Sequence, residues 1–191
     1  SAASDVYKRQ ALLLSDHRRL NPVKGGMIRH LLFHPTFKLV FWFRFVSYLQ
    51  SSQNLFLKKT GRLFYLILKH YELLNGIQLP VGTNIGGGLV FPHFSCIIIN
   101  GGATIGENCT ILQGVTIGEN ENWDVPKIGN NCVLAAGSKV IGNVTIGNNV
   151  LVGAGAVVTR DIPDNAIVVG VPAKVISFQG KKKVEHYHIC G

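Results

Sequence analysis

The sequence of 191 residues is poor in charge, with Asp, Glu, Lys and Arg making up only 15% of it, against 47% for hydrophobic residues. That balance excludes a disordered chain and is compatible with a large core. Cysteine is also scarce: Cys96, Cys109, Cys132 and Cys190 form no CxxC pair, and no secretory signal pattern precedes them. We therefore expect reduced thiols and a cytoplasmic protein. Glycine is plentiful, with 22 residues, but without a Gly-X-Y period, which excludes collagen.

Acidic residues are outnumbered, and the net charge of +9 is unevenly distributed. Residues 1–77 contain twelve basic against three acidic residues, residues 78–180 four against six, and residues 181–191 three against one. The basic N-terminal part indicates either a solvated face or attraction to an anionic membrane surface or anionic substrate. Nucleic acid is not expected as a partner, because no recognised binding motif accompanies the charge.

Uninterrupted apolar runs are missing too. The most apolar stretch, residues 31–49, is interrupted by polar residues and by Pro35, so we expect no membrane span. Residues 25–77 instead predict helices that pack against a partner subunit or, as an alternative, touch a membrane surface. Pro35 suits the start of one helix, and Asn75-Gly76 suits the end of a second helix that begins near Leu55.

An internal repeat dominates residues 78–176. Aliphatic residues recur at every sixth position, at Ile99, Ile105, Ile111 and Ile117 and then at Ile128, Leu134, Val140, Ile146, Val152 and Val158. An earlier set keeps this spacing in a shifted register, at Leu79, Ile85, Phe91 and Ile97. Three hexads make one triangular coil of about 18 residues, with aliphatic side chains inside and Gly or Asn at the turns. The period predicts a mainly β fold, a left-handed parallel β-helix, rather than a sandwich of short strands.

The predicted organisation has four parts. A poorly determined segment, 1–24, precedes a helical part, 25–77, the β-helix, 78–176, and a basic tail, 177–191; we assign no role to residues 1–10, whose sequence could be non-native. The repeat is interrupted once, because eleven residues separate Ile117 from Ile128. We expect the extra segment to loop out of the β-helix on one face, which in solenoids is often the binding face.

The repeat, the short helical part and the Gly170-Val171-Pro172-Ala173-Lys174 ending resemble the hexapeptide-repeat acyltransferases over about residues 25–176. The resemblance is to serine acetyltransferases and to related O-acetyltransferases of surface-polysaccharide synthesis. It implies a homotrimer with each active site in the cleft between neighbouring β-helices. There, acetyl would pass from acetyl-CoA directly to an acceptor hydroxyl, without a metal.

The resemblance identifies His93, in the segment FPHFSC, with the family's catalytic histidine, which removes the proton of the acceptor hydroxyl. His93 is also the only histidine between residues 78 and 180, and an imidazole can accept a proton near neutral pH. The alternative to a catalytic role is that His93 is a hydrogen-bonded structural histidine. A single histidine also argues against the zinc-dependent carbonic anhydrases of this fold, since catalytic zinc needs three protein ligands. His186, His188 and Cys190 could bind a metal, but a frayed tail is the expected state.

Coenzyme A would lie nearer the C-terminal coils and contact backbone groups of small residues. The matching positions are Ala136, Gly137, Gly153, Ala154 and Gly155, with Lys139 and Lys174 as candidates for the CoA phosphates. Tight turns alone would also explain these glycines, and both lysines could instead be solvated.

The chain departs from the serine acetyltransferases at three positions. Pro92 stands where the family has an aspartate that helps to bind serine, and Val125 stands where it has a second histidine. Gln78 stands where the family has a carboxylate that orients the catalytic histidine; an amide oxygen can set the tautomer but adds no charge. These losses favour a sugar or polysaccharide-precursor hydroxyl as the acceptor. The alternatives are a serine O-acetyltransferase of cysteine synthesis and a catalytically inactive scaffold.

Overall fold

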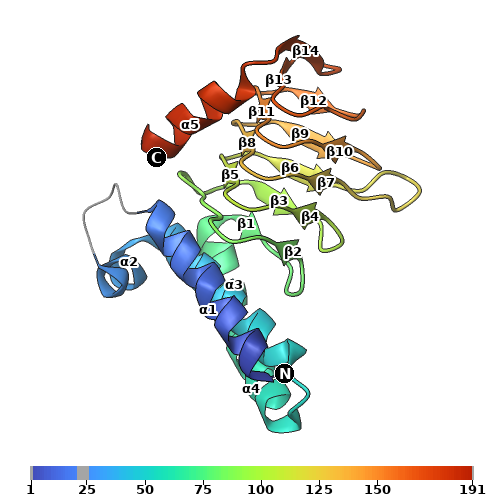
Figure 1. Cartoon of the computed structure of the whole chain (residues 1–191). Coiled ribbons are helices and arrows are strands. Elements are labelled where there is room, and N and C mark those ends of the chain that lie inside the picture. The colour runs from blue at the N-terminus through green and yellow to red at the C-terminus, as the bar shows by residue number, and fades with distance from the viewer. Residues whose placement is uncertain (1, 21–25, 191) are drawn as a thin grey trace.

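The computed structural model describes residues 2–20 and 26–190, in which five helices flank a stack of short strands (Figure 1). The helices are α1 (Ala2–Arg19), α2 (Met27–Phe33), α3 (Pro35–Ser51), α4 (Leu55–Asn75) and α5 (Gly180–Cys190). The strands are β1 (Ile77–Gln78), β2 (Asn84–Ile85), β3 (Ile97–Ile99), β4 (Thr104–Ile105), β5 (Thr110–Ile111), β6 (Thr116–Gly118), β7 (Lys127–Ile128), β8 (Val133–Leu134), β9 (Lys139–Ile141), β10 (Thr145–Ile146), β11 (Leu151–Val152), β12 (Val157–Val158), β13 (Ile167–Val169) and β14 (Lys174–Ser177). None of the helices in these ranges is long and apolar enough to cross a membrane.

The strands form the three sides of a prism. The first sheet has the order β1-β3-β6-β9-β12, the second β2-β4-β7-β10 and the third β5-β8-β11-β13-β14. Among the described strands the pairing is parallel except between β13 and β14. Because each strand from β1 to β13 lies in a different sheet from the strand before it, the chain winds around the prism. This confirms the left-handed parallel β-helix predicted from the six-residue period.

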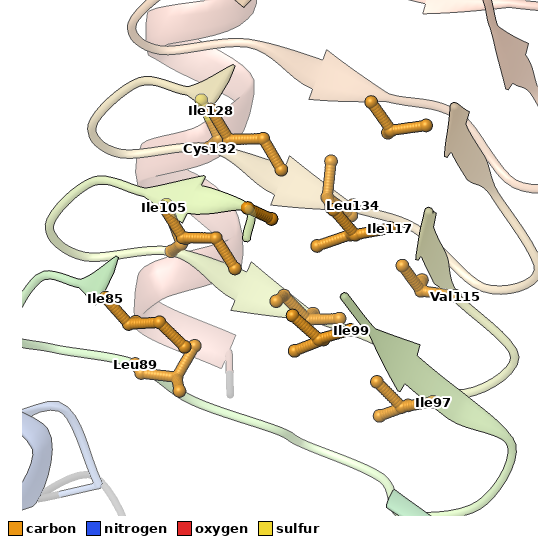
Figure 2. Close-up of a cluster of buried hydrophobic side chains, with 14 of the residues drawn as sticks. Ile85, Leu89, Ile97, Ile99, Ile105, Val115, Ile117, Ile128, Cys132 and Leu134 are labelled. Atoms are coloured by element: carbon orange, nitrogen blue, oxygen red, sulfur yellow. The ribbon is translucent and has the colours of Figure 1, made fainter. Parts of the chain in front are cut away.

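The core consists of aliphatic columns inside the prism. Ile85, Ile105 and Ile128 lie above one another on the second sheet, where they pair strand to strand (Figure 2). Ile99 and Ile117 pair in the same way on the first sheet, and each is at most 1% exposed. Full burial of one such side chain contributes about 1.5–3 kcal/mol to folding. The column therefore stabilises each coil against its neighbours.

Asparagines turn the chain at the corner between the second and third sheets. Asn108, Asn131, Asn149 and Asn165 have φ between 54° and 61°, a left-handed conformation that Asn tolerates. The side-chain amides of the first three each donate to the Oδ1 of the next asparagine, at 3.2, 3.2 and 3.1 Å. Asparagine thus takes the turn role predicted for it at this corner.

The helical part begins and ends its helices where the sequence predicts. Pro35 occupies the first turn of α3, and Gly76, with φ 61°, ends α4. Asn54 caps α4, since its Oδ1 accepts hydrogen bonds from Phe56 N at 2.8 Å and Leu57 N at 3.4 Å. Residue 76 leads directly into β1, so α4 adjoins the first coil of the β-helix.

Two terminal segments are more ordered than the sequence indicates. Helix α1 covers most of residues 1–24, and its Arg19 donates to Gly88 O at 2.7 Å, 69 residues away. The tail expected to be frayed forms α5, in which Gly180 N donates to Asn165 O at 2.8 Å and Val184 is buried. The partners of both helices are distant in sequence, so no local pattern reveals them, and the expectation of a frayed tail is corrected by α5.

The interruption of the repeat loops out as predicted, between β6 and β7 (Figure 1). Asn120 Oδ1 closes the loop by accepting from Asn122 N and Asp124 N, both at 3.0 Å. Trp123 at its tip is 78% exposed. The loop leaves the corner between the first and second sheets.

Candidate active site

The predicted site residues gather at the corner between the third and first sheets. We call this the glycine corner and define it as the four turns 91–96, 112–115, 135–138 and 153–156. The turns stack through backbone hydrogen bonds: Gly114 N donates to Ser95 O at 3.1 Å, Gly137 N to Gln113 O at 2.9 Å, and Gly155 N to Ala136 O at 2.9 Å. Residues that are 60 positions apart in the chain thus lie along one edge of the prism.

Most of the predicted residues fall on this edge or beside it. His93 lies in the first turn of the glycine corner, Ala136 and Gly137 in the third, and Gly153, Ala154 and Gly155 in the fourth. The first sheet places Gln78 and Lys139 in a single row, through the pairs Gln78–Ile98, Ile98–Thr116 and Thr116–Lys139. Lys174 lies in β14, paired with Val169.

His93 is exposed, and within the described residues its ring makes no hydrogen bond. Gln78 is likewise exposed and makes no side-chain hydrogen bond in that part of the chain. The two side chains therefore lie near the same corner without a direct hydrogen bond. An imidazole with free ring nitrogens can receive a proton from a bound hydroxyl. The orienting role of Gln78 stays a prediction.

The turn that carries His93 has an unusual backbone. Ser95 and Cys96 have φ of 105° and 55°, a region that side-chain-bearing residues rarely adopt. The turn lies against Gly76, at which an added Cβ would be 3.3 Å from Cys96 N. Ile97 N also donates to Gly76 O at 3.1 Å. The end of α4 thus holds the turn in this conformation, and such strained positions concentrate at functional sites.

A cavity of about 500 Å³ opens beside this turn, between α4 and the first coil. It is lined by Lys69, Glu72, Leu73, Gly76, Ile77, Gln78, Ser95, Cys96, Ile97 and Ile98. Sequence analysis predicted only Gln78 among these residues. One sequence signal was available: Glu72 is the only acidic residue between Asp16 and Glu107.

An ion pair lies in the cavity wall. Lys69 Nζ is 2.6 Å from Glu72 Oε2, and Glu72 Oε1 accepts from Leu79 N at 3.4 Å. Partial burial lowers the pKa of Lys69, but its hydrogen bonds with Glu72 and Tyr65 outweigh that effect and raise the pKa above its ordinary value. Lys69 is therefore a cation at neutral pH.

Gly153 and Gly155, in the fourth turn of the glycine corner, differ in the space around them. A Cβ on Gly155 would meet no atom within 4 Å, so this turn is open to its surroundings. A Cβ on Gly153 would lie 2.7 Å from Val169 Cγ1, so packing of the next coil requires that glycine. Lys139 is exposed, and its Nζ lies 3.3 Å from Thr116 Oγ1. Lys174 is exposed as well.

Metal-ligating groups do not cluster in the described residues, where no set of three or more His, Cys, Asp or Glu side chains could hold an ion. The side chains of His188 and Cys190 lie outside the described part. Their suggested metal site therefore stays untested.

The repeat region is similar to known proteins. A family model described as bacterial transferase hexapeptide (six repeats) matches residues 126–160, from just before β7 to just after β12. This segment therefore matches the hexapeptide-repeat transferases, and the same six-residue spacing precedes it, from Ile99 to Ile117. It is 41% identical over 118 residues to a serine acetyltransferase of Synechococcus elongatus, covering 60% of this chain and 48% of that protein. It is 37% identical over 134 residues to one of Staphylococcus xylosus, covering 69% and 62%.

Solved structures give the same picture for this hexapeptide-repeat protein. The serine acetyltransferase of Neisseria gonorrhoeae in complex with serine superposes with a TM-score of 0.74, at 29% identity, over 91% of this chain and 71% of the other. A serine acetyltransferase in complex with cysteine superposes with a TM-score of 0.76, at 25% identity, over 92% and 73%. The chain spans between about half and two thirds of the two curated relatives, which are longer proteins.

Proposed function

We propose that this protein is an acetyl-CoA-dependent serine O-acetyltransferase with His93 as its general base. The observation that carries the proposal is the glycine corner, where an exposed histidine and small-residue turns from separate coils share one edge. The names of the relatives supply the reaction, since all the curated proteins compared above are serine acetyltransferases.

The reaction is a direct transfer. His93 takes the proton from the acceptor hydroxyl while the oxygen attacks the carbonyl carbon of the acetyl thioester. The C–O bond forms, the C–S bond breaks, and the CoA thiolate leaves. The imidazolium then returns the proton to that sulfur, so His93 ends the cycle neutral.

Coenzyme A lies along the upper glycine corner in this proposal. Neighbouring coils are about 4.8 Å apart, so the turn before β12 lies about 14 Å above the turn of His93. An extended pantetheine arm can run along such an edge, where the open turn at Gly155 leaves room for it. Lys139 and Lys174, both exposed, are the cations available for the CoA phosphates.

Serine replaces the sugar as the first candidate acceptor, because the relatives compared above act on serine by name. A sugar hydroxyl remains the second candidate. It is favoured by Pro92 and Val125, which stand where the resemblance implies an aspartate and a histidine.

A homotrimer in the cytoplasm completes the proposal. Phe94 and Ile98, beside the candidate site, are 50% and 47% exposed, as expected for residues that a neighbouring subunit covers. The neighbour would supply the second wall of the cleft.

An acceptor panel tests the function. The purified protein is incubated with acetyl-CoA and either L-serine or a set of sugars, and the release of the CoA thiol is measured. We expect turnover with L-serine. Turnover with sugars alone would replace the acceptor, and no turnover with any hydroxyl acceptor would overturn the enzyme assignment.

A further inference from the structure

Helix α4 contributes two charged side chains, together with Leu73, to a cavity whose remaining walls belong to its C-cap Gly76 and to the β-helix. Of the residues that line it, only Lys69 and Glu72 are charged. Both come from the last two turns of α4, whereas Gln78, Ser95 and Cys96 come from the first coil and its corner. The pair therefore lies at the junction of the two parts of the protein.

The pair is held in place from several sides. The side chain of Glu72 is only 7% exposed and is tied to Leu79 N and to Lys69 Nζ. The ammonium of Lys69 also lies 5.2 Å from the ring centroid of Tyr65, within the range of a cation–π contact. The Lys69 side chain is 37% exposed, so its remaining N–H donors are accessible. A charged pair fixed in this way is preorganised for a ligand.

The position of the cavity matches one end of the proposed reaction. The residues proposed for coenzyme A precede or belong to β9, β12 and β14, on the coils above His93. The cavity lies at the opposite end, between α4, β1 and the turn that leads from His93 into β3. An acceptor that approaches the thioester from the side away from the cofactor would occupy this end.

We propose that this cavity is the acceptor subsite, and that Lys69 and Glu72 of α4 select an acceptor that carries both an ammonium and a carboxylate. The inference rests on the proposed acetyltransferase function. An amino acid has two opposite charges, and Lys69 can pair with its carboxylate while Glu72 pairs with its ammonium. The apolar side chains of Leu73, Ile77 and Ile98 complete the lining of the cavity around the two charges.

Substrate analogues separate the two contacts. Ethanolamine has the hydroxyl and the ammonium of serine but no carboxylate, and 3-hydroxypropionate has the carboxylate but no ammonium. Lys69→Met should raise KM for L-serine by about 10- to 100-fold while hardly changing that for ethanolamine. Glu72→Gln, which keeps an acceptor for Leu79 N, should raise KM for L-serine and ethanolamine but not for 3-hydroxypropionate. KM for acetyl-CoA should stay within about twofold in both variants.

The controls keep this inference separate from the function itself. Lys59→Met removes an exposed cation elsewhere on α4 and should leave every KM unchanged. If the parent protein turns over L-serine but both variants keep its KM, the subsite is wrong and the enzyme assignment stands. If a variant weakens all three acceptors equally, its effect is structural and the selection by charge is wrong. If the parent protein releases no CoA with L-serine, the proposed function fails first.

Discussion

The carboxylate of Asp16 accepts hydrogen bonds from Arg44 Nε at 3.0 Å and from Arg44 Nη2 at 3.2 Å, and this ion pair fastens α1 to α3. Asp16 also accepts from Leu89 N at 2.8 Å, while Arg44 donates to Ile85 O and Gly86 O, both at 2.6 Å. Two helices and the first coil of the β-helix therefore meet at one buried pair. Its side chains are 0% and 9% exposed.

Substituting Asp16→Asn should destabilise the protein by about 3–5 kcal/mol, because it leaves a buried guanidinium without its counter-charge. The amide oxygen can still accept from Leu89 N, but the amide nitrogen would point a donor at Arg44 Nε, so the loss combines the missing charge with a missing hydrogen bond. Urea unfolding measures the change. Glu121→Gln, at an exposed position of the β6–β7 loop, is the matched control and should change the free energy of unfolding by less than about 0.5 kcal/mol. Equal behaviour of the two variants would contradict the prediction.

The helical part should lose stability in mild acid. Burial, followed by repulsion from His30, lowers the pKa values of both His17 and His34. The folded state thus favours neutral rings, so the unfolded chain takes up protons first when the pH falls below about 6.5. The free energy of unfolding should therefore fall as the pH drops through and below about 6.5, and level off only once the folded-state rings are protonated too.

A variant isolates one of these histidines. His34 Nδ1 caps α3 by accepting from Phe37 N at 3.4 Å, and Asn is an equally suitable capping residue. His34→Asn should keep the stability at pH 7.5 and weaken its dependence on pH. Thermal unfolding at a series of pH values is the measurement, and an unchanged pH dependence would remove His34 from the explanation.

Glycines on the stacked coils should differ in their tolerance of a methyl group. At Gly106 an added Cβ would lie 2.7 Å from Gly129 O, and backbone atoms cannot move aside cheaply. Gly106→Ala should cost about 1–3 kcal/mol, the range for an overpacked site. Gly102→Ala is the control, since its Cβ would make an ordinary contact of 3.4 Å with Val125 Cγ2. The measurement is the melting temperature of each variant, and similar values for the two would contradict the prediction.

His93→Ala should lower kcat by about 10²- to 10⁴-fold, as expected for loss of a general base. His93 is exposed and makes no hydrogen bond among the described residues, so the variant should have the same melting temperature as the parent protein. If the parent protein is active and the variant is equally active, His93 is not the general base.

The variant Gly155→Asn tests whether coenzyme A binds along the turn that contains Gly155. Asn adopts positive φ readily, as at Asn131, and no atom lies within 4 Å of the new Cβ, so the fold should tolerate it. Its side chain would project into the proposed path of coenzyme A and should raise KM for acetyl-CoA about tenfold or more. KM for the acceptor is the internal reference, and an unchanged KM for acetyl-CoA would move the cofactor away from this turn.

The β-helix could be predicted because its determinants are local and repeated. A buried aliphatic residue at every sixth position, such as Ile105 and Ile111, needs only a strand and a turn for each hexad. The ends of α3 and α4 were predictable for a similar reason, since Pro35 and Gly76 act through their own backbone angles.

Other features exist only because distant residues meet. Asp16 and Arg44 lie 28 residues apart, and Arg19 and Gly88 lie 69 apart, so the order of α1 depends on the packed helices and coil. The acceptor cavity likewise needs α4 folded against the first coil. The sequence by itself determined the repeat, and with it one edge shared by His93, Gly137 and Gly155. Only the tertiary structure decided that Lys69 and Glu72 face the same cavity as Cys96, because the packing of α4 against the turn before β3, not local propensity, brings these residues together.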